Sequence, residues 1–92
     1  MAYRAFQKIT ADATVKTLAD AITNKHSRAW VAVEGAAIRS KTDGGNPSAT
    51  DGIPWPPGSY VELESQDEVN NFKFIRRDGA DATLQVESWG VL

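Results

Sequence analysis

The chain has one histidine and no cysteine, which limits the chemistry that its side chains can perform. His26 lies in a polar stretch, and a general base or a zinc site would need a second titratable partner or further ligands beside it. The serines occur in no Gly-x-Ser-x-Gly setting, so a hydrolase triad has no motif support. We therefore expect a solvated loop histidine and no catalytic site.

Three oxygen-bearing side chains, Asp43, Asn46 and Asp51, lie in a glycine-containing segment and could ligate calcium. The alternating acidic spacing of a helix-loop-helix calcium site, which ends in a glutamate, is absent. Asx side chains that close turns on their own backbone account for the same residues. Gly44-Gly45 lacks the lysine of a phosphate loop and is interpreted as a turn. We expect neither a metal ion nor a cofactor.

Alternation within the expected strands places large aromatic side chains away from the core. Val31 and Val33 share one face of a strand, which leaves Trp30 on the opposite face. By the same parity, Tyr60 lies on the side of the glutamates that follow it. Trp89 also lies outside if no bulge near the next glycine turns it inward.

Trp55, on a proline turn, completes a set of four aromatic residues expected to point outward. Each can bury roughly 150–250 Å², so exposing several of them forgoes substantial stabilisation unless something covers them. Partner subunits are one such cover, and loops of the same chain are another. Tryptophan also stacks on sugar rings, which keeps a carbohydrate-binding or receptor-binding module as the alternative. The interface candidates are Trp30, Trp55, Tyr60 and Trp89, together with Tyr3 and Phe6 near the N-terminus.

Apolar residues alternate with period two along most of the chain, which predicts a mainly β protein. Strands are expected over residues 29–34, 37–41, 59–64, 71–76 and 82–89, each bounded by Gly, Pro, Asn or Asp. Their inward residues predict a core of Val31, Val33, Ile38, Val61, Leu63, Phe72, Phe74, Leu84 and Val86. The expected fold is one small antiparallel β-sandwich over residues 1–92, jelly-roll-like or immunoglobulin-like.

Turn-forming residues mark the connections. Residues 52–58 combine prolines, locked near φ −65°, with glycines that can take positive φ, and predict a stiff turn that leads into a strand. An Asp-Gly pair predicts a hairpin connection over residues 76–81. Residues 40–59 lack periodic apolar residues and form a loop of unusual length for so small a domain, either functional or a mobile tip.

The first third of the chain supports more than one structure. Residues 13–22 place apolar side chains at helical spacing, yet their β-branched residues fit a bulged strand, which we favour. Residues 1–10 are either an arm that docks on a partner or the first strand of the sandwich.

Length and charge narrow the classes of function. Ninety-two residues without cysteine must be stabilised by apolar burial or by oligomerisation, which favours a homo-oligomer. A formal net charge of −2 provides no concentrated basic face for nucleic acid. No apolar run approaches the roughly 20 residues of a membrane span, and the N-terminus lacks the apolar core of a signal peptide. We expect a soluble protein made in a cytoplasm, with no nucleic-acid or membrane partner.

The segment Ser48-Ala49-Thr50-Asp51-Gly52-Ile53-Pro54-Trp55-Pro56-Pro57-Gly58-Ser59-Tyr60-Val61-Glu62-Leu63 resembles a turn-and-strand pattern in small β-sandwich proteins of tailed bacteriophages. The resemblance covers roughly residues 29–89. It departs from the pattern at Trp55, where a smaller aliphatic residue is usual, and over residues 38–41, which replace a glycine-containing strand end.

The resemblance implies a non-enzymatic virion structural protein. A capsid decoration (cement) protein is the leading expectation, and a tail or neck accessory protein is the alternative within this class. The implied partner is the major capsid protein or another virion protein. The implied location is the virion, assembled in the host cytoplasm.

Overall fold

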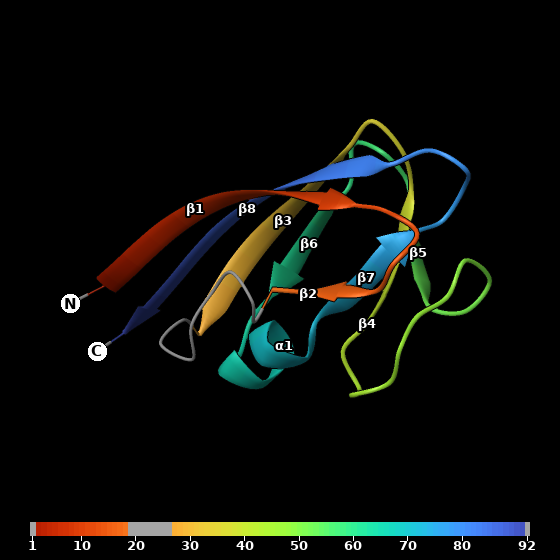
Figure 1. Cartoon of the computed structure of the whole chain (residues 1–92). Coiled ribbons are helices and arrows are strands. Elements are labelled where there is room, and N and C mark those ends of the chain that lie inside the picture. The colour runs from red at the N-terminus through yellow and green to blue at the C-terminus, as the bar shows by residue number, and fades with distance from the viewer. Residues whose placement is uncertain (1, 19–26, 92) are drawn as a thin grey trace.

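The computed structural model describes residues 2–18 and 27–91, which form two four-stranded antiparallel sheets packed face to face (Figure 1). In chain order the elements are β1 (Ala2–Ala11), β2 (Lys16–Thr17), β3 (Arg28–Glu34), β4 (Ile38–Lys41), β5 (Ile53–Trp55), β6 (Tyr60–Leu63), α1 (Gln66–Asn71), β7 (Lys73–Arg76) and β8 (Ala82–Val91). The expected mainly β sandwich is confirmed.

Strand pairing identifies the sandwich as a jelly roll. The first sheet has the order β1-β8-β3-β6, and the second has the order β2-β7-β4-β5. The first strand therefore pairs with the last, the second with the next to last, and so on inward, with successive pairs in alternate sheets. A chain that folds as one long hairpin and then rolls up gives this order, whereas immunoglobulin-like sandwiches divide their strands differently.

The inward residues of the long strands meet between the sheets and form the core. All nine predicted core residues are buried: Val31, Val33, Ile38, Val61, Leu63, Phe72, Phe74, Leu84 and Val86. Leu18 and Val69 join them. The rings of Phe72 and Phe74 lie 5.6 Å apart between centroids. Period-two alternation therefore predicted the core because one face of each strand is buried.

The short helix α1 was not expected. Ser65 is its N-cap and accepts a hydrogen bond from the backbone N–H of Glu68 at 3.1 Å, while Val69 is its buried residue. The Ser-x-x-Glu spacing is that of a capping box, a signal that the sequence contains. Because α1 continues to Asn71, β7 begins later than predicted. None of the helical structure within residues 2–18 and 27–91 is long and apolar enough to cross a membrane.

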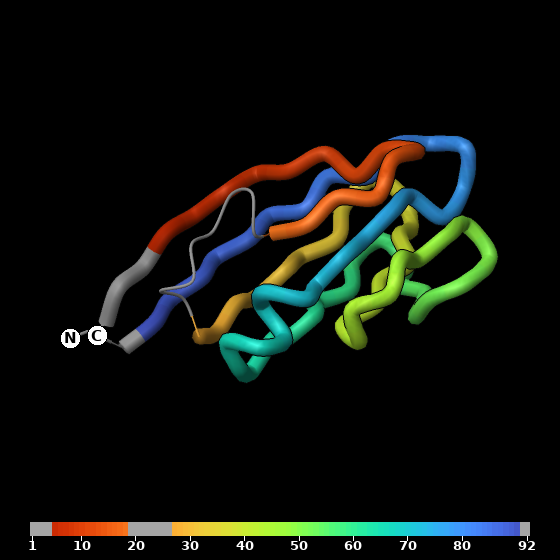
Figure 2. Tube along the Cα trace, turned by 60° about the horizontal axis from the view of Figure 1, so that its bottom comes forward, coloured from red at the N-terminus to blue at the C-terminus, as the bar shows by residue number. Residues whose placement is uncertain are grey.

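The N-terminal segment is the first strand of the sandwich. β1 pairs with β8 along its whole length, from Ala2 opposite Val91 to Ala11 opposite Ala82. The start of β1 and the end of β8 therefore lie together, at the opposite end of the molecule from residues 42–52 (Figure 2). Of the ambiguous segment 13–22, Lys16–Thr17 is a strand, and residues 19–26 lie outside the described part, His26 among them.

The predicted hairpin over residues 76–81 is wrong. β7 pairs with β2 and β4, whereas β8 pairs with β1 and β3, so this connection crosses from one sheet to the other. Gly79 is not among the glycines with positive φ, as a tight hairpin turn would require. The long-range pairing of the jelly roll overrides the local Asp-Gly signal.

The proline-rich segment is part strand and part turn. Gly52 and Gly58 take φ of 131° and 92°, as expected of the glycines that frame it. Between them, Ile53–Trp55 forms the edge strand β5 against β4, which was not predicted. Pro54 is tolerated there because an edge strand can dispense with one N–H donor.

Replacing Gly58 by alanine is expected to lower the free energy of unfolding by about 1 kcal/mol or somewhat more, because φ of 92° is unfavourable for a residue with a Cβ. Gly79→Ala is the matched control. Neither site has a heavy atom within 4 Å of the new Cβ, so only the backbone conformation differs. Denaturant unfolding of both variants measures this, and equal effects would contradict it.

Candidate functional site

The outer face of the first sheet carries four large aromatic side chains, which we call the aromatic face: Phe6 on β1, Trp89 on β8, Trp30 on β3 and Tyr60 on β6. Phe6, Trp30 and Tyr60 are exposed over 63%, 52% and 73% of their surface, and Trp89 is half-buried. Trp30, Tyr60 and Trp89 therefore point outward, as period-two parity predicted. Tyr3 pairs with Gly90 along the backbone, and its side chain lies outside the described part.

The strand register arranges three of these residues on a diagonal. Trp89 lies opposite Arg28, two residues before Trp30 on β3. Trp30 in turn lies opposite Glu62, two residues after Tyr60 on β6. Trp89, Trp30 and Tyr60 therefore cross three neighbouring strands, each two residues further along in the register, and we call this line the diagonal. Exposed large apolar side chains that gather on one face, with polar residues around them, mark interaction sites.

The two indoles of the diagonal contact each other edge to face. The ring centroids of Trp30 and Trp89 are 5.6 Å apart, and their planes are 87° to each other. This T-shaped arrangement is a favoured geometry for aromatic pairs. Because the planes are almost perpendicular, the two rings cannot both lie flat against one straight sugar chain. The pair therefore offers no continuous flat platform for an extended sugar chain.

On the outer face of the second sheet, the side chain of Arg39 is hydrogen-bonded to the loop of residues 42–52. Arg39 on β4 donates from Nε to the backbone oxygen of Ala49 at 3.0 Å, and from Nη1 to that of Gly52 at 2.8 Å. A Cβ at Gly52 would lie 3.1 Å from the backbone oxygen of Ser40, so the chain passes very close to β4 at this point. Glycine is what allows this approach.

Two lysines complete the attachment of this loop. Lys41 Nζ lies 2.8 Å from the carboxylate of Asp51, and Lys73 Nζ donates to the backbone oxygen of Gly44 and to Asn46 Oδ1, both at 3.2 Å. The long loop of the sequence is thus fixed to β4 and β7 by three cations. The outer face of the second sheet thus binds a loop of the same chain, while the outer face of the first sheet carries the aromatic face.

The calcium candidates have structural roles. Asp51 binds Lys41, Asn46 accepts from Lys73, and Asp43 Oδ1 accepts from the backbone N–H of Gly45 at 2.8 Å, as an Asx turn does. Within the described ranges, no group of three or more His, Cys, Asp or Glu is placed to hold a metal ion.

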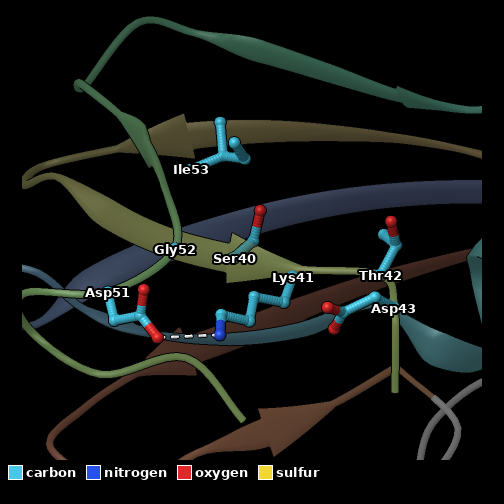
Figure 3. A pocket seen from close by; sticks show the side chains of 7 residues that line it. All are labelled: Ser40, Lys41, Thr42, Asp43, Asp51, Gly52 and Ile53. Atoms are coloured by element: carbon cyan, nitrogen blue, oxygen red, sulfur yellow. Dashed lines mark hydrogen bonds and ion pairs between the residues drawn. The ribbon is translucent and has the colours of Figure 1, made fainter. Parts of the chain in front are cut away.

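A surface pocket of about 430 Å³ lies where this loop meets β4 and β5 (Figure 3). It is lined by Ser40, Lys41, Thr42, Asp43, Asp51, Gly52 and Ile53. Its lysine and one of its aspartates are joined to each other, as the dashed line in Figure 3 shows. Its serine hydroxyl accepts a hydrogen bond from Trp55. These groups are engaged in holding the loop and form no nucleophile–base arrangement.

Trp55 is an exception to the outward set, and the expectation that it points away from the core is wrong. Its ring packs against the core, and its Nε1 donates to the Oγ of buried Ser40 at 2.8 Å. The cause is β5, which pairs Trp55 with the inward residue Ile38. A residue assigned to a turn has no predicted parity, so the sequence did not indicate this.

The ion pair in the loop changes the titration of both partners. The hydrogen bond from Lys41 lowers the pKa of the Asp51 carboxyl, and the same bond raises the pKa of Lys41. The pKa of Asp12 is also lowered, first by the backbone N–H of Thr14 and then by Lys16. Both carboxylates are therefore stabilised in their charged forms.

Comparison with known protein families, curated proteins and solved structures finds no significant match. The function must therefore be inferred from the aromatic face and from the residues themselves.

Trp55→Ala is expected to lower the free energy of unfolding by about 2 kcal/mol, because it removes core contacts and leaves the buried hydroxyl of Ser40 without its donor. Tyr60→Ala, on the aromatic face, is the control and should change it by less than about 0.5 kcal/mol. Denaturant unfolding compares the two. Equal losses would show that Tyr60 belongs to the folding core.

In Asp51→Asn, the melting temperature is expected to fall less steeply than in the wild type as the pH is lowered. A lowered carboxyl pKa stabilises the fold at pH values above the ordinary value of about 3.9, and this contribution is lost as pH falls through the folded-state pKa. Melting temperatures from pH 7 down to pH 2 measure the slope. Asp78→Asn, on an exposed connection, is the control, and a slope equal to the wild type in Asp51→Asn would contradict the assignment.

Proposed function

We propose that this protein is a non-enzymatic structural protein of a tailed-bacteriophage virion, a capsid decoration (cement) protein that binds and stabilises the assembled shell. The observation that carries the proposal is the aromatic face. Phe6, Trp30, Tyr60 and Trp89 lie on the outer side of the first sheet and are not part of the hydrophobic core. It is the surface through which the protein associates within the particle.

The energetics of the aromatic face support association as its role. Buried aromatic anchors typically contribute 2 kcal/mol or more to a protein interface, and they are enriched at its centre. Trp30 and Trp89 already hold each other edge to face, so little side-chain freedom remains to be lost on binding. A rigid aromatic patch of this kind is suited to docking rather than to chemistry.

The architecture and the sequence support the virion assignment by analogy. Eight-stranded jelly rolls occur in viral capsid proteins and in lectins, so the fold alone is compatible with both. The perpendicular indoles disfavour the lectin alternative. The resemblance over residues 48–63 to small phage proteins favours the virion.

A cement protein acts by binding the assembled lattice and not its separate subunits. Binding to the assembled state alone stabilises it by mass action, and contacts to neighbouring coat subunits add avidity. Such a mechanism requires a stable surface and no turnover. The loop fixed by Arg39, Lys41 and Lys73 and the edge-to-face Trp pair provide rigid surfaces on both sheets.

Trp30→Ala is expected to weaken co-sedimentation with empty capsids of the encoding virus at least tenfold, which corresponds to a lost anchor of about 1.4 kcal/mol or more. The lost edge-to-face contact with Trp89 should lower the melting temperature by only about 4–8 °C and leave the protein folded at the assay temperature. Arg77→Ala is the control, because Arg77 is a large exposed residue on the β7–β8 connection and belongs to neither sheet.

The alternatives give different results in the same assay. Wild-type binding to purified tails or necks and not to capsids would replace the decoration role by that of a tail or neck accessory protein. Binding on a glycan array, lost in Trp30→Ala, would indicate a carbohydrate-binding or receptor-binding module. Capsid binding that Trp30→Ala leaves intact would show that the aromatic face is not the surface used.

A further inference from the structure

We propose that the aromatic face pairs with the aromatic face of a second copy of this chain, about a two-fold axis that runs along the diagonal of Trp89, Trp30 and Tyr60. This rests on the proposed function and names the first partner of the same surface. In a two-fold interface the same patch occurs on both sides, so it must be complementary to itself. The strand register determines which residues the two copies place over each other.

Charged residues flank the diagonal in complementary positions. Arg28 lies on β3 opposite Trp89, on one side of the diagonal. Glu87 lies on β8 opposite Trp30, on the other side. Both residues adjoin the diagonal: Arg28 lies two residues from Trp30 along β3, and Glu87 lies one strand away from Trp30 across the sheet. A rotation about the diagonal therefore brings Arg28 of one copy over Glu87 of the other, twice per dimer.

The acid on the far side of Trp30, Glu62, does not oppose this arrangement. The same rotation brings Glu62 of one copy over Ala32 of the other, and not over a second acid, because these residues also lie on opposite sides of the diagonal. Trp30 and Tyr60 lie on the axis itself and meet their own equivalents. Like charges placed directly opposite each other across an interface would cost affinity. A face that binds only an unrelated protein is under no constraint to avoid superposing like charges when it meets its own copy.

The size of the face limits the area that the dimer can bury. Four strands about 4.8 Å apart, each about seven residues long at about 3.3 Å per residue, give roughly 450 Å² per copy, or roughly 900 Å² in total. This upper bound lies below the roughly 1,200 Å² at which standard specific interfaces begin and is typical of weak or transient association, so we expect dissociation constants in the micromolar range or weaker.

Such a dimer leaves the second sheet of each copy on the outside, with its loop of residues 42–52 held in place. Two equivalent outer surfaces would let one dimer contact two coat subunits at once. Linked binding of this kind can exceed either single affinity by a factor of about 10² to 10⁴. A variant that cannot dimerise would therefore also bind capsids more weakly, as expected of Trp30→Ala.

Charge reversal at the two flanking positions tests the two-fold arrangement. Arg28→Glu places two acids over each other in its own dimer, and Glu87→Arg places two cations over each other, so each variant alone should dimerise at least tenfold more weakly than the wild type. In an equimolar mixture, the new carboxylate at position 28 of the first variant would meet the new guanidinium at position 87 of the second. The unaltered Glu87 of the first and Arg28 of the second would meet as well. The mixture should therefore dimerise with near wild-type affinity.

Sedimentation velocity from about 5 to 500 µM measures all four samples, and Arg77→Glu, an arginine exposed on the β7–β8 connection, is the control that should behave as the wild type. Restoration in the mixture cannot arise within one chain, so it reports a contact between copies. A wild type that is monomeric throughout this range would overturn the proposal. A wild type that dimerises while the mixture remains as weak as the single variants would overturn the two-fold axis along the diagonal.

The outcomes for the dimer and for the proposed function are separable. A monomeric wild type that still co-sediments with capsids, and loses this in Trp30→Ala, would contradict the dimer and leave the decoration role standing. A dimer that responds to charge reversal as described but binds no virion fraction would support the dimer and contradict the decoration role.

Discussion

Two stacked sheets can bury only one face of each strand between them, and this limit determines the rest of the molecule. In the jelly roll every second residue of the long strands enters a shared core, and the residues between them must lie on one of two outer faces. Residues 2–18 and 27–91 form these two layers and no third one that would cover the outer faces. A large apolar side chain on an outer face therefore stays exposed unless a loop or another molecule covers it.

The two sheets meet this limit in different ways. On the second sheet, Arg39 and Lys73 use their charged ends to bind oxygen atoms of residues 42–52, so the chain covers part of its own surface. On the first sheet, Trp30 and Tyr60 remain more than half exposed. The asymmetry is informative because the same core supports both sheets. Folding explains the inward residues of each sheet equally well, and it leaves the outward aromatics of one sheet unexplained.

Period-two alternation predicted which residues of the long strands are buried. It did not predict the features that depend on pairing between strands far apart in the sequence. The core and the outward position of Trp30 follow from period-two parity, which is a local property. The inward position of Trp55 depends on β5, a three-residue strand formed only because β4 lies beside it. The crossing over residues 76–81 likewise depends on strands far apart in the sequence. Helix α1 is different, since its Ser-x-x-Glu cap is present in the sequence and is enough to predict a helix start.

The net charge of the protein opposes the pairing of two aromatic faces only weakly. A net charge of −2 gives little repulsion between copies, so solubility does not keep two such faces apart. The edge-to-face contact of Trp30 and Trp89 orders the centre of the patch before any partner arrives, which reduces the entropy lost on association. A surface that carries exposed aromatic rings, has two of them in contact and is flanked by Arg28 and Glu87 on opposite sides of one line has the properties of an interface. The strand register brings these groups together.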